Sequence, residues 1–170
     1  MDESDRPLRV MADANVLIAG IFFPRWFHEF LQHALRNDFK LVLTGYTIEE
    51  ARERMAKGTP AQQQALEQFL ADCEYEPAPD PSQTEVEANA GLVHDLTAIP
   101  LALAAINAGV DYLVTNDKDL TTQDEMTAVL RQRLQPISVG RFLKEVMGWD
   151  SNELERIRRR NWSEMPAIAA

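Results

Sequence analysis

Cysteine, long apolar runs and positive charge are all scarce in this sequence. Cys73 is the only cysteine among the 170 residues, which excludes an internal disulfide and a zinc cluster built from cysteines and histidines. The longest nearly unbroken apolar run, Ile99 to Ala108, is too short to cross a bilayer, and the polar start MDESDRP has no signal-peptide character. We therefore expect a cytoplasmic protein that does not associate with a membrane.

The charge balance limits the nucleic-acid surfaces that the chain can offer. Lysine and arginine number 17 against 27 aspartates and glutamates, and this formal charge of −10 argues against a broad basic face for phosphates. A local basic rim stays open, although scattered basic residues usually form only a solvated surface. Its candidates lie in the first third of the chain: Arg25, Lys40, Arg52, Arg54 and Lys57.

Histidine and cysteine offer no second kind of site. His28, His33 and His94 show neither HxH nor HExxH spacing, so we interpret them as ordinary core or surface residues. Cys73 has no obvious base beside it and is expected to be a small core residue rather than a nucleophile.

Short apolar runs alternate with helical patterns along the chain. A composition that is 45% apolar over 170 residues is enough for the core of one domain. Buried strands are predicted at 8–12, 41–44, 111–115 and 136–139, with a weaker candidate at 73–77. Helices are predicted at 26–35, from Thr47, from Pro60, and at 86–92, 100–108, 141–147 and 152–160. This alternation predicts a three-layer α/β/α fold with a mostly parallel central sheet.

Three acidic residues lie where predicted strands end. Asp13 follows the first strand, Glu50 lies in the first turn after the second, and Asp117 follows the strand at 111–115. Ligands of open α/β sheets collect beyond the carboxyl ends of the strands, so these side chains are expected to meet there. Clustered carboxylates repel one another unless a cation neutralises them. The pattern therefore predicts a Mg²⁺ or Mn²⁺ site at this edge of the sheet.

Each acid alone also has a purely structural explanation. Asp13 could cap the helix that follows it, and Asp117 could stabilise a turn. Glu50 could be the capping-box partner of Thr47. The functional interpretation rests on the occurrence of all three at strand ends.

The same segments resemble the PIN-domain family, which includes VapC-like toxins of toxin–antitoxin pairs and other RNA-cleaving nucleases. The stretch VMADANVLI around Asp13 resembles the family's opening strand with its DTNVL-type motif. The stretch LVLTGYTIEEA around Glu50 resembles the segment that carries the family's glutamate. The stretch DYLVTNDKDL around Asp117 is similar to the family's DYLVTGDKDL, with Asn116 in place of the usual glycine. The likeness spans about residues 8–147.

One position departs from the family pattern. Residues 93–100, VHDLTAIP, align with a family stretch of the form DxxDxP, whose second aspartate completes the acidic site. Ala98 stands at that second position. Asp95 matches the first aspartate and could supply the missing carboxylate if the backbone turns it inward. The alternatives are an active nuclease that uses Asp95 and a weakened or inactive one.

The resemblance implies metal-assisted hydrolysis of RNA phosphodiesters, in which the ion lowers the pKa of a bound water and offsets charge on the phosphate. The implied metal ligands are Asp13, Asp117 and Glu50, and Asp95 is a further catalytic candidate. Roles behind these ligands or facing the substrate are implied for three neighbours: Asn15, Thr115 and Asp119. The implied partners are RNA, an antitoxin protein and a second copy of the chain.

Two other interpretations compete with a nuclease. Haloacid-dehalogenase-like phosphatases use a DxDx(T/V) motif, but Asn15 cannot exchange the proton that their second aspartate transfers. A degenerate PIN scaffold that binds RNA or a protein partner is the alternative that Ala98 supports.

The family likeness closes before Trp149. We expect the PIN-like domain at residues 1–148 and an accessory helix or tail at 149–170. The charges of this tail, including Arg158 to Arg160, indicate a packed or solvated helix, with a basic hook for RNA or a partner as the sharper alternative.

Overall fold

A five-stranded sheet forms the centre of the protein. The structure, a computed structural model, describes residues 6–93, 95–125 and 127–165. The strands run in the order β3-β2-β1-β4-β5, and every neighbouring pair is parallel. Their bounds are β1 Arg9–Ala12, β2 Lys40–Thr44, β3 Glu76–Ala78, β4 Tyr112–Val114 and β5 Pro136–Ile137.

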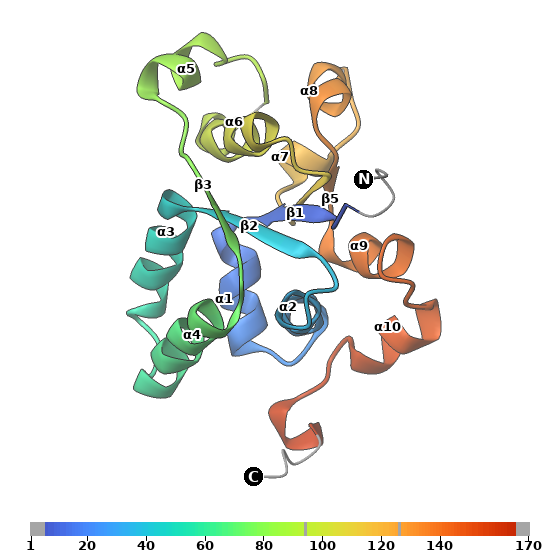
Figure 1. The fold of residues 1–170 in the computed structure, drawn as a ribbon. Helices are drawn as coiled ribbons and strands as arrows, with labels where there is room; N and C mark the ends of the chain where they lie inside the picture. The colour runs from blue at the N-terminus through green and yellow to red at the C-terminus, as the bar shows by residue number, and fades with distance from the viewer. Residues whose placement is uncertain (1–5, 94, 126, 166–170) are drawn as a thin grey trace.

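Helices cover both faces of the sheet, which confirms the predicted three-layer α/β/α fold (Figure 1). One face carries α1 Ala14–Phe22, α2 Trp26–Leu35, α3 Gly45–Met55, α4 Pro60–Asp72, α9 Val139–Glu145 and α10 Ser151–Ile157. The other carries α5 Gln83–Ala88, α6 Ile99–Ala108, α7 Lys118–Thr121 and α8 Ala128–Arg133. The described residues also form the 3₁₀ turns η2 Leu96–Ala98 and η3 Trp162–Glu164.

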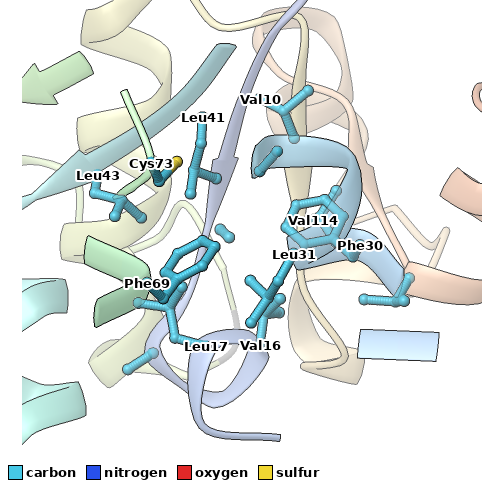
Figure 2. Close-up of a cluster of buried hydrophobic side chains, with 14 of the residues drawn as sticks. Val10, Val16, Leu17, Phe30, Leu31, Leu41, Leu43, Phe69, Cys73 and Val114 are labelled. Carbon is cyan, nitrogen blue, oxygen red and sulfur yellow. The ribbon is translucent and has the colours of Figure 1, made fainter. Parts of the chain in front are cut away.

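Strand residues alternate between the two hydrophobic cores. Val10 and Leu41 face the core under α1 and α2, where they pack with Phe30 (Figure 2). Their strand neighbours Met11 and Val42 face the opposite core under α6. Full burial of such a side chain contributes about 1.5–3 kcal/mol, so strands apolar on both faces fix the sheet in the centre.

Local signals placed several helix ends correctly. Thr59 caps α4 with a complete capping box, and Gly109 ends α6 in the left-handed conformation at φ +66°. The start of α3 was predicted wrongly, because its cap is Thr44 rather than Thr47. The segment TGYTIEE holds two threonines, and the parallel strand β2 ends on the first of them. Glu50 is therefore no capping-box partner and lies in the second turn.

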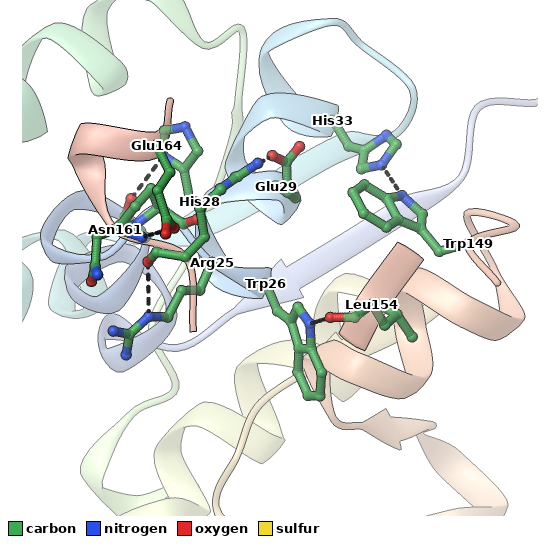
Figure 3. A network of polar contacts seen from close by, with 12 residues as sticks. Arg25, Trp26, His28, Glu29, His33, Trp149, Leu154, Asn161 and Glu164 are labelled. Carbon is green, nitrogen blue, oxygen red and sulfur yellow. Dashed lines mark hydrogen bonds and ion pairs between the residues drawn. The ribbon is translucent and has the colours of Figure 1, made fainter. Parts of the chain in front are cut away.

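The terminal segment from Trp149 to Glu164 packs against α2 and the end of α1 (Figure 3). Arg160 Nη2 lies 2.7 Å from Glu29 Oε1, and the two side chains are only 17% and 15% exposed. The indole N–H groups of Trp26 and Trp149 donate to the Leu154 carbonyl and to a ring nitrogen of His33. The structure confirms a packed helix, whereas a basic hook for RNA or a partner, with Arg158 and Arg159 exposed, stays a prediction. The division of the chain at residue 148 stays a prediction.

Three helices of the structure, α1, α7 and α8, have no counterpart among the predicted ranges, and the other differences are of extent. The weak strand predicted at 73–77 is β3 at Glu76–Ala78, and the helix predicted at 86–92 is α5 at Gln83–Ala88. Cys73 is buried as predicted, and this burial raises the pKa of its thiol to about 11. His94 lies outside the described residues. No helix in the described ranges combines the length and apolarity that a membrane crossing requires.

Candidate metal centre

The order of the strands creates a switch point between β1 and β4. From β1 the chain proceeds to β2 on one side, and from β4 it proceeds to β5 on the other. Ala12 is level with Val114 in the register, so the loops that follow these residues leave the sheet side by side. Crevices outside the carboxyl ends of strands at such points are the usual ligand sites of open α/β sheets.

Asp13 directly follows β1, and its carboxylate has a structural role at the start of α1. Its Oδ1 accepts a hydrogen bond from the Val16 N–H at 3.0 Å, which caps α1. Its Oδ2 accepts one from the Thr115 hydroxyl at 2.5 Å. The predicted capping role is therefore confirmed. Each carboxylate oxygen retains a second lone pair, so capping does not exclude binding a cation.

Ionisation of the Asp13 carboxyl is unfavourable in its surroundings. Burial raises its pKa above the ordinary value, and the negative charges of Asp117 and Glu50 raise it further. The hydrogen bonds from Thr115 and Val16 oppose this shift. The direction of the shift indicates a position where positive charge would stabilise the ionised form.

Thr115 joins the two aspartates. Its side chain is fully buried behind the site. While its hydroxyl donates to Asp13, its oxygen accepts from the Asp117 N–H at 3.0 Å. Asp117 in turn caps α7 by accepting from the Asp119 N–H at 2.9 Å. This chain of contacts fixes the relative position of the Asp13 and Asp117 carboxyl groups.

Four acids predicted for the site line one open pocket of about 250 Å³: Asp13, Glu50, Asp95 and Asp117. Asn15 lines it as well, whereas Thr115 lies behind it. Asp80, from the loop after β3, adds an acid that the sequence did not point to. The structure thus brings together segments that follow four of the five strands.

The tightest acidic group in the described ranges consists of Asp95, Asp117 and Asp119. One carboxylate oxygen from each lies within 4.8 Å of the other two. Asp95 caps η2 and accepts from both the N–H and the hydroxyl of Thr97, which lowers the pKa of its carboxyl. The backbone therefore turns Asp95 towards Asp117, which is the condition for Asp95 to supply the carboxylate that Ala98 lacks. Ala98 lines the same pocket and is 6% exposed.

The donor set suits a hard divalent cation. All candidate ligands are carboxylate oxygens, the atoms that Mg²⁺ and Mn²⁺ prefer, and no histidine or cysteine is among the described residues that line the pocket. The group around Asp117 is close enough to share one ion. Asp13 and Glu50 line the pocket without belonging to that tightest group, and their part in binding an ion stays a prediction.

Arg54 lines the pocket, although little in the sequence distinguishes it from the other basic residues nearby. Its guanidinium donates to Glu50, four residues earlier on α3, and to Asn15 on α1. By contrast, Arg52 pairs with Glu67 on α4 and does not line the pocket. The i,i+4 spacing from Glu50 was the available signal, but only the docking of α3 beside the sheet shows which arginine faces the acids.

Comparisons with known proteins agree with this architecture. A sequence model described as PIN domain matches residues 9–119, which is well over half of the chain. No match was found among curated proteins. Among solved structures, the chain is similar to PAE2754 from Pyrobaculum aerophilum, with a TM-score of 0.54 and 21% identity over 84% of this chain and 97% of that one.

Two further structures share the fold. VapBC2 from Rickettsia felis, bound to a DNA fragment from their promoter, gives a TM-score of 0.51 and 17% identity over 77% of this chain and 98% of that one. FitAcB from Neisseria gonorrhoeae gives 0.51 and 15% over the same shares, 77% and 98%. Identities this low establish the fold alone. Together with the match over residues 9–119, they lead to one conclusion: the chain belongs to the PIN-domain family.

Proposed function

We propose that this protein is a ribonuclease that hydrolyses RNA phosphodiesters with Mg²⁺ or Mn²⁺. The observation that carries the proposal is the convergence of Asp13, Asp95 and Asp117 on one open pocket, with Thr115 holding two of them in place. Membership of the PIN-domain family agrees with this chemistry, since the sequence resemblance implies nuclease activity.

Each residue has a distinct part in this proposal. A bound divalent cation supplies a water of lowered pKa and positive charge beside the phosphate. Asp117, Asp95 and Asp119 would hold it, with Asp13, which follows the adjacent strand β1, as a further ligand. Thr115 orients Asp13 by donating to it, and the capped start of α7 orients Asp117. Glu50, hydrogen-bonded to Arg54, would orient water at the edge of the site.

A degenerate scaffold is the second candidate, and Ala98 is the observation that favours it. The methyl group of Ala98 lines the pocket where the family pattern has a carboxylate. Such a scaffold would bind RNA or a protein without cleaving RNA. A protein antitoxin and a second copy of the chain are proposed partners, from the resemblance to VapC-like toxins and the fold shared with VapBC2.

Cleavage of a labelled RNA with Mn²⁺ and with chelator separates the two candidates. We expect cleavage only with Mn²⁺, and loss of cleavage in Asp13→Asn and Asp117→Asn, because asparagine keeps the helix cap but removes the charge. Asp150→Asn is the matched control, since Asp150 caps α10 away from the pocket. If the folded parent binds RNA but leaves it intact at millimolar Mn²⁺, the scaffold candidate replaces the nuclease.

A further inference from the structure

We propose that one face of α3 binds a single-stranded RNA, with a base stacked on Tyr46 and a phosphate held by Arg54. This inference rests on the proposed function and names the form of the substrate. Tyr46, Glu50 and Arg54 follow one another at intervals of four residues and all line the pocket. Residues spaced in this way share one face of a helix.

The geometry of α3 gives this row a length and a direction. At a rise of 1.5 Å per residue, the Cα atoms of Tyr46 and Arg54 lie about 12 Å apart, with Glu50 between them. A stacked strand advances by about 3.4 Å per nucleotide, so the row spans roughly three to four nucleotides. The adjoining face of α3, with Thr47, Ala51 and Met55, is buried in the core. The row is therefore a fixed edge of the pocket.

Tyr46 is an exposed aromatic ring with an anchored backbone. It is 60% exposed, and its N–H donates to the Asp80 carboxylate at 3.2 Å. Stacking of a base on such a ring contributes about 1–3 kcal/mol for any base, because every base has a π-face. The exposed ring of Tyr46 thus offers a base an apolar contact that the carboxylates of the pocket cannot provide.

Arg54 is the positively charged member among the described residues that line the pocket. Its side chain is 47% exposed, and its hydrogen bonds to Glu50 and Asn15 hold it in place. A guanidinium has five N–H donors in a planar fork, so donors remain for the oxygens of a phosphate.

The overall charge determines which form of RNA fits this row. A formal charge of −10 and a single arginine among the described lining residues allow few phosphate contacts, on which recognition of duplex RNA largely depends. Single-stranded bases are instead free to leave their neighbours and stack on an aromatic ring. Binding should therefore depend strongly on Tyr46 and only weakly on salt. A plot of the logarithm of the binding constant against the logarithm of the salt concentration should have a slope near −0.7 for each phosphate neutralised.

Fluorescence anisotropy with a labelled eight-nucleotide RNA, alone and annealed to its complement, tests the inference. The buffer contains Ca²⁺ in place of Mn²⁺ to suppress turnover. We expect tighter binding of the single strand, a roughly 5- to 150-fold loss in Tyr46→Ala and near-parent binding in Tyr46→Phe. Arg54→Gln should remove about one phosphate contact, so the slope of the salt dependence should become less negative by about 0.7.

Matched controls lie outside the pocket. Phe23→Ala removes an exposed ring, 48% accessible, and Arg141→Gln removes an arginine paired with Glu145 at i,i+4, as Arg54 is with Glu50. Neither should change binding. Equal affinity for duplex and single strand, parent-like binding by Tyr46→Ala, or no RNA binding by the parent overturns the inference.

A cleavage assay in Mn²⁺ on the same variants separates this failure from failure of the proposed function. If the parent protein cleaves RNA and Tyr46→Ala binds RNA like the parent, only the proposed stacking on Tyr46 is refuted. A parent that binds single strands through Tyr46 but never cleaves them supports the surface and refutes the nuclease.

Discussion

Replacement of Thr115 by valine should loosen the centre of the site without changing the shape of the core. The substitution keeps the volume of this fully buried side chain and removes its hydroxyl. Asp13 then loses a hydrogen bond of 2.5 Å, and the Asp117 N–H loses its acceptor at 3.0 Å. A hydrogen bond to a charged group contributes about 1.5–3 kcal/mol and a neutral one about 0.5–1.5 kcal/mol. We expect a loss of roughly 2–4 kcal/mol in the free energy of unfolding.

The loss should depend on pH with a defined sign. Burial already raises the pKa of Asp13 above its ordinary value of 3.8, so the folded state binds this proton more tightly than the unfolded state does. Ionised Asp13 therefore costs stability as the pH rises from 3.8 through the raised folded pKa. Removal of the Thr115 hydrogen bond, which favours the ionised form, enlarges this cost. The effect of Thr115→Val should be larger at pH 7 than near pH 4.

Urea unfolding in chelator at both pH values measures this effect, with Thr115→Ser as the control that keeps the hydroxyl. In a domain of this size the expected loss lowers Tm by on the order of 4–16 °C at neutral pH. If Thr115→Val is as stable as Thr115→Ser at both pH values, the hydroxyl does not link the two aspartates energetically.

Three further predictions concern Asp95, Glu76 and the terminal segment. Asp95→Ala should abolish Mn²⁺-dependent RNA cleavage and Ala98→Asp should restore it, whereas an unaffected Asp95→Ala enzyme would exclude Asp95 from the reaction. Glu76→Gln should cost less than about 1 kcal/mol, because Glu76 is 40% exposed beside Arg9. Arg9 lowers the pKa of Glu76 in the folded protein. The loss of stability in Glu76→Gln, measured by urea unfolding, should therefore be present above pH 4.5 and vanish as the pH falls through the lowered folded pKa. Deletion of 149–170 should lower the urea midpoint by the equivalent of about 3 kcal/mol or more, and an unchanged midpoint would show that the tail is dispensable.

The sheet was predictable because its strands are buried on both faces. Such strands read as continuous apolar runs, and four of the five stand out in the sequence. β3 was weak because it is an edge strand of three residues that includes Pro77. Caps with one possible residue, such as Thr59, were also predictable, whereas two nearby threonines left the start of α3 ambiguous.

The acidic site was predictable in its strand-end members and not in its neighbours on helices. Asp13 and Asp117 directly follow strands, so the parallel sheet places them together. The directions of Tyr46 and Arg54 depend on how α3 docks, which no local pattern specifies. The same limit applies to Arg160, whose partner Glu29 lies 131 residues away in the sequence.

Calorimetric titration with Mn²⁺ tests most directly the central claim that this pocket is a divalent cation site. The account predicts one ion bound per parent chain, loss of binding in Asp117→Asn, and unchanged binding in Asp150→Asn, which carries the same substitution at a helix cap outside the pocket. No heat of binding at millimolar Mn²⁺, or equal binding by Asp117→Asn and the parent, would contradict it.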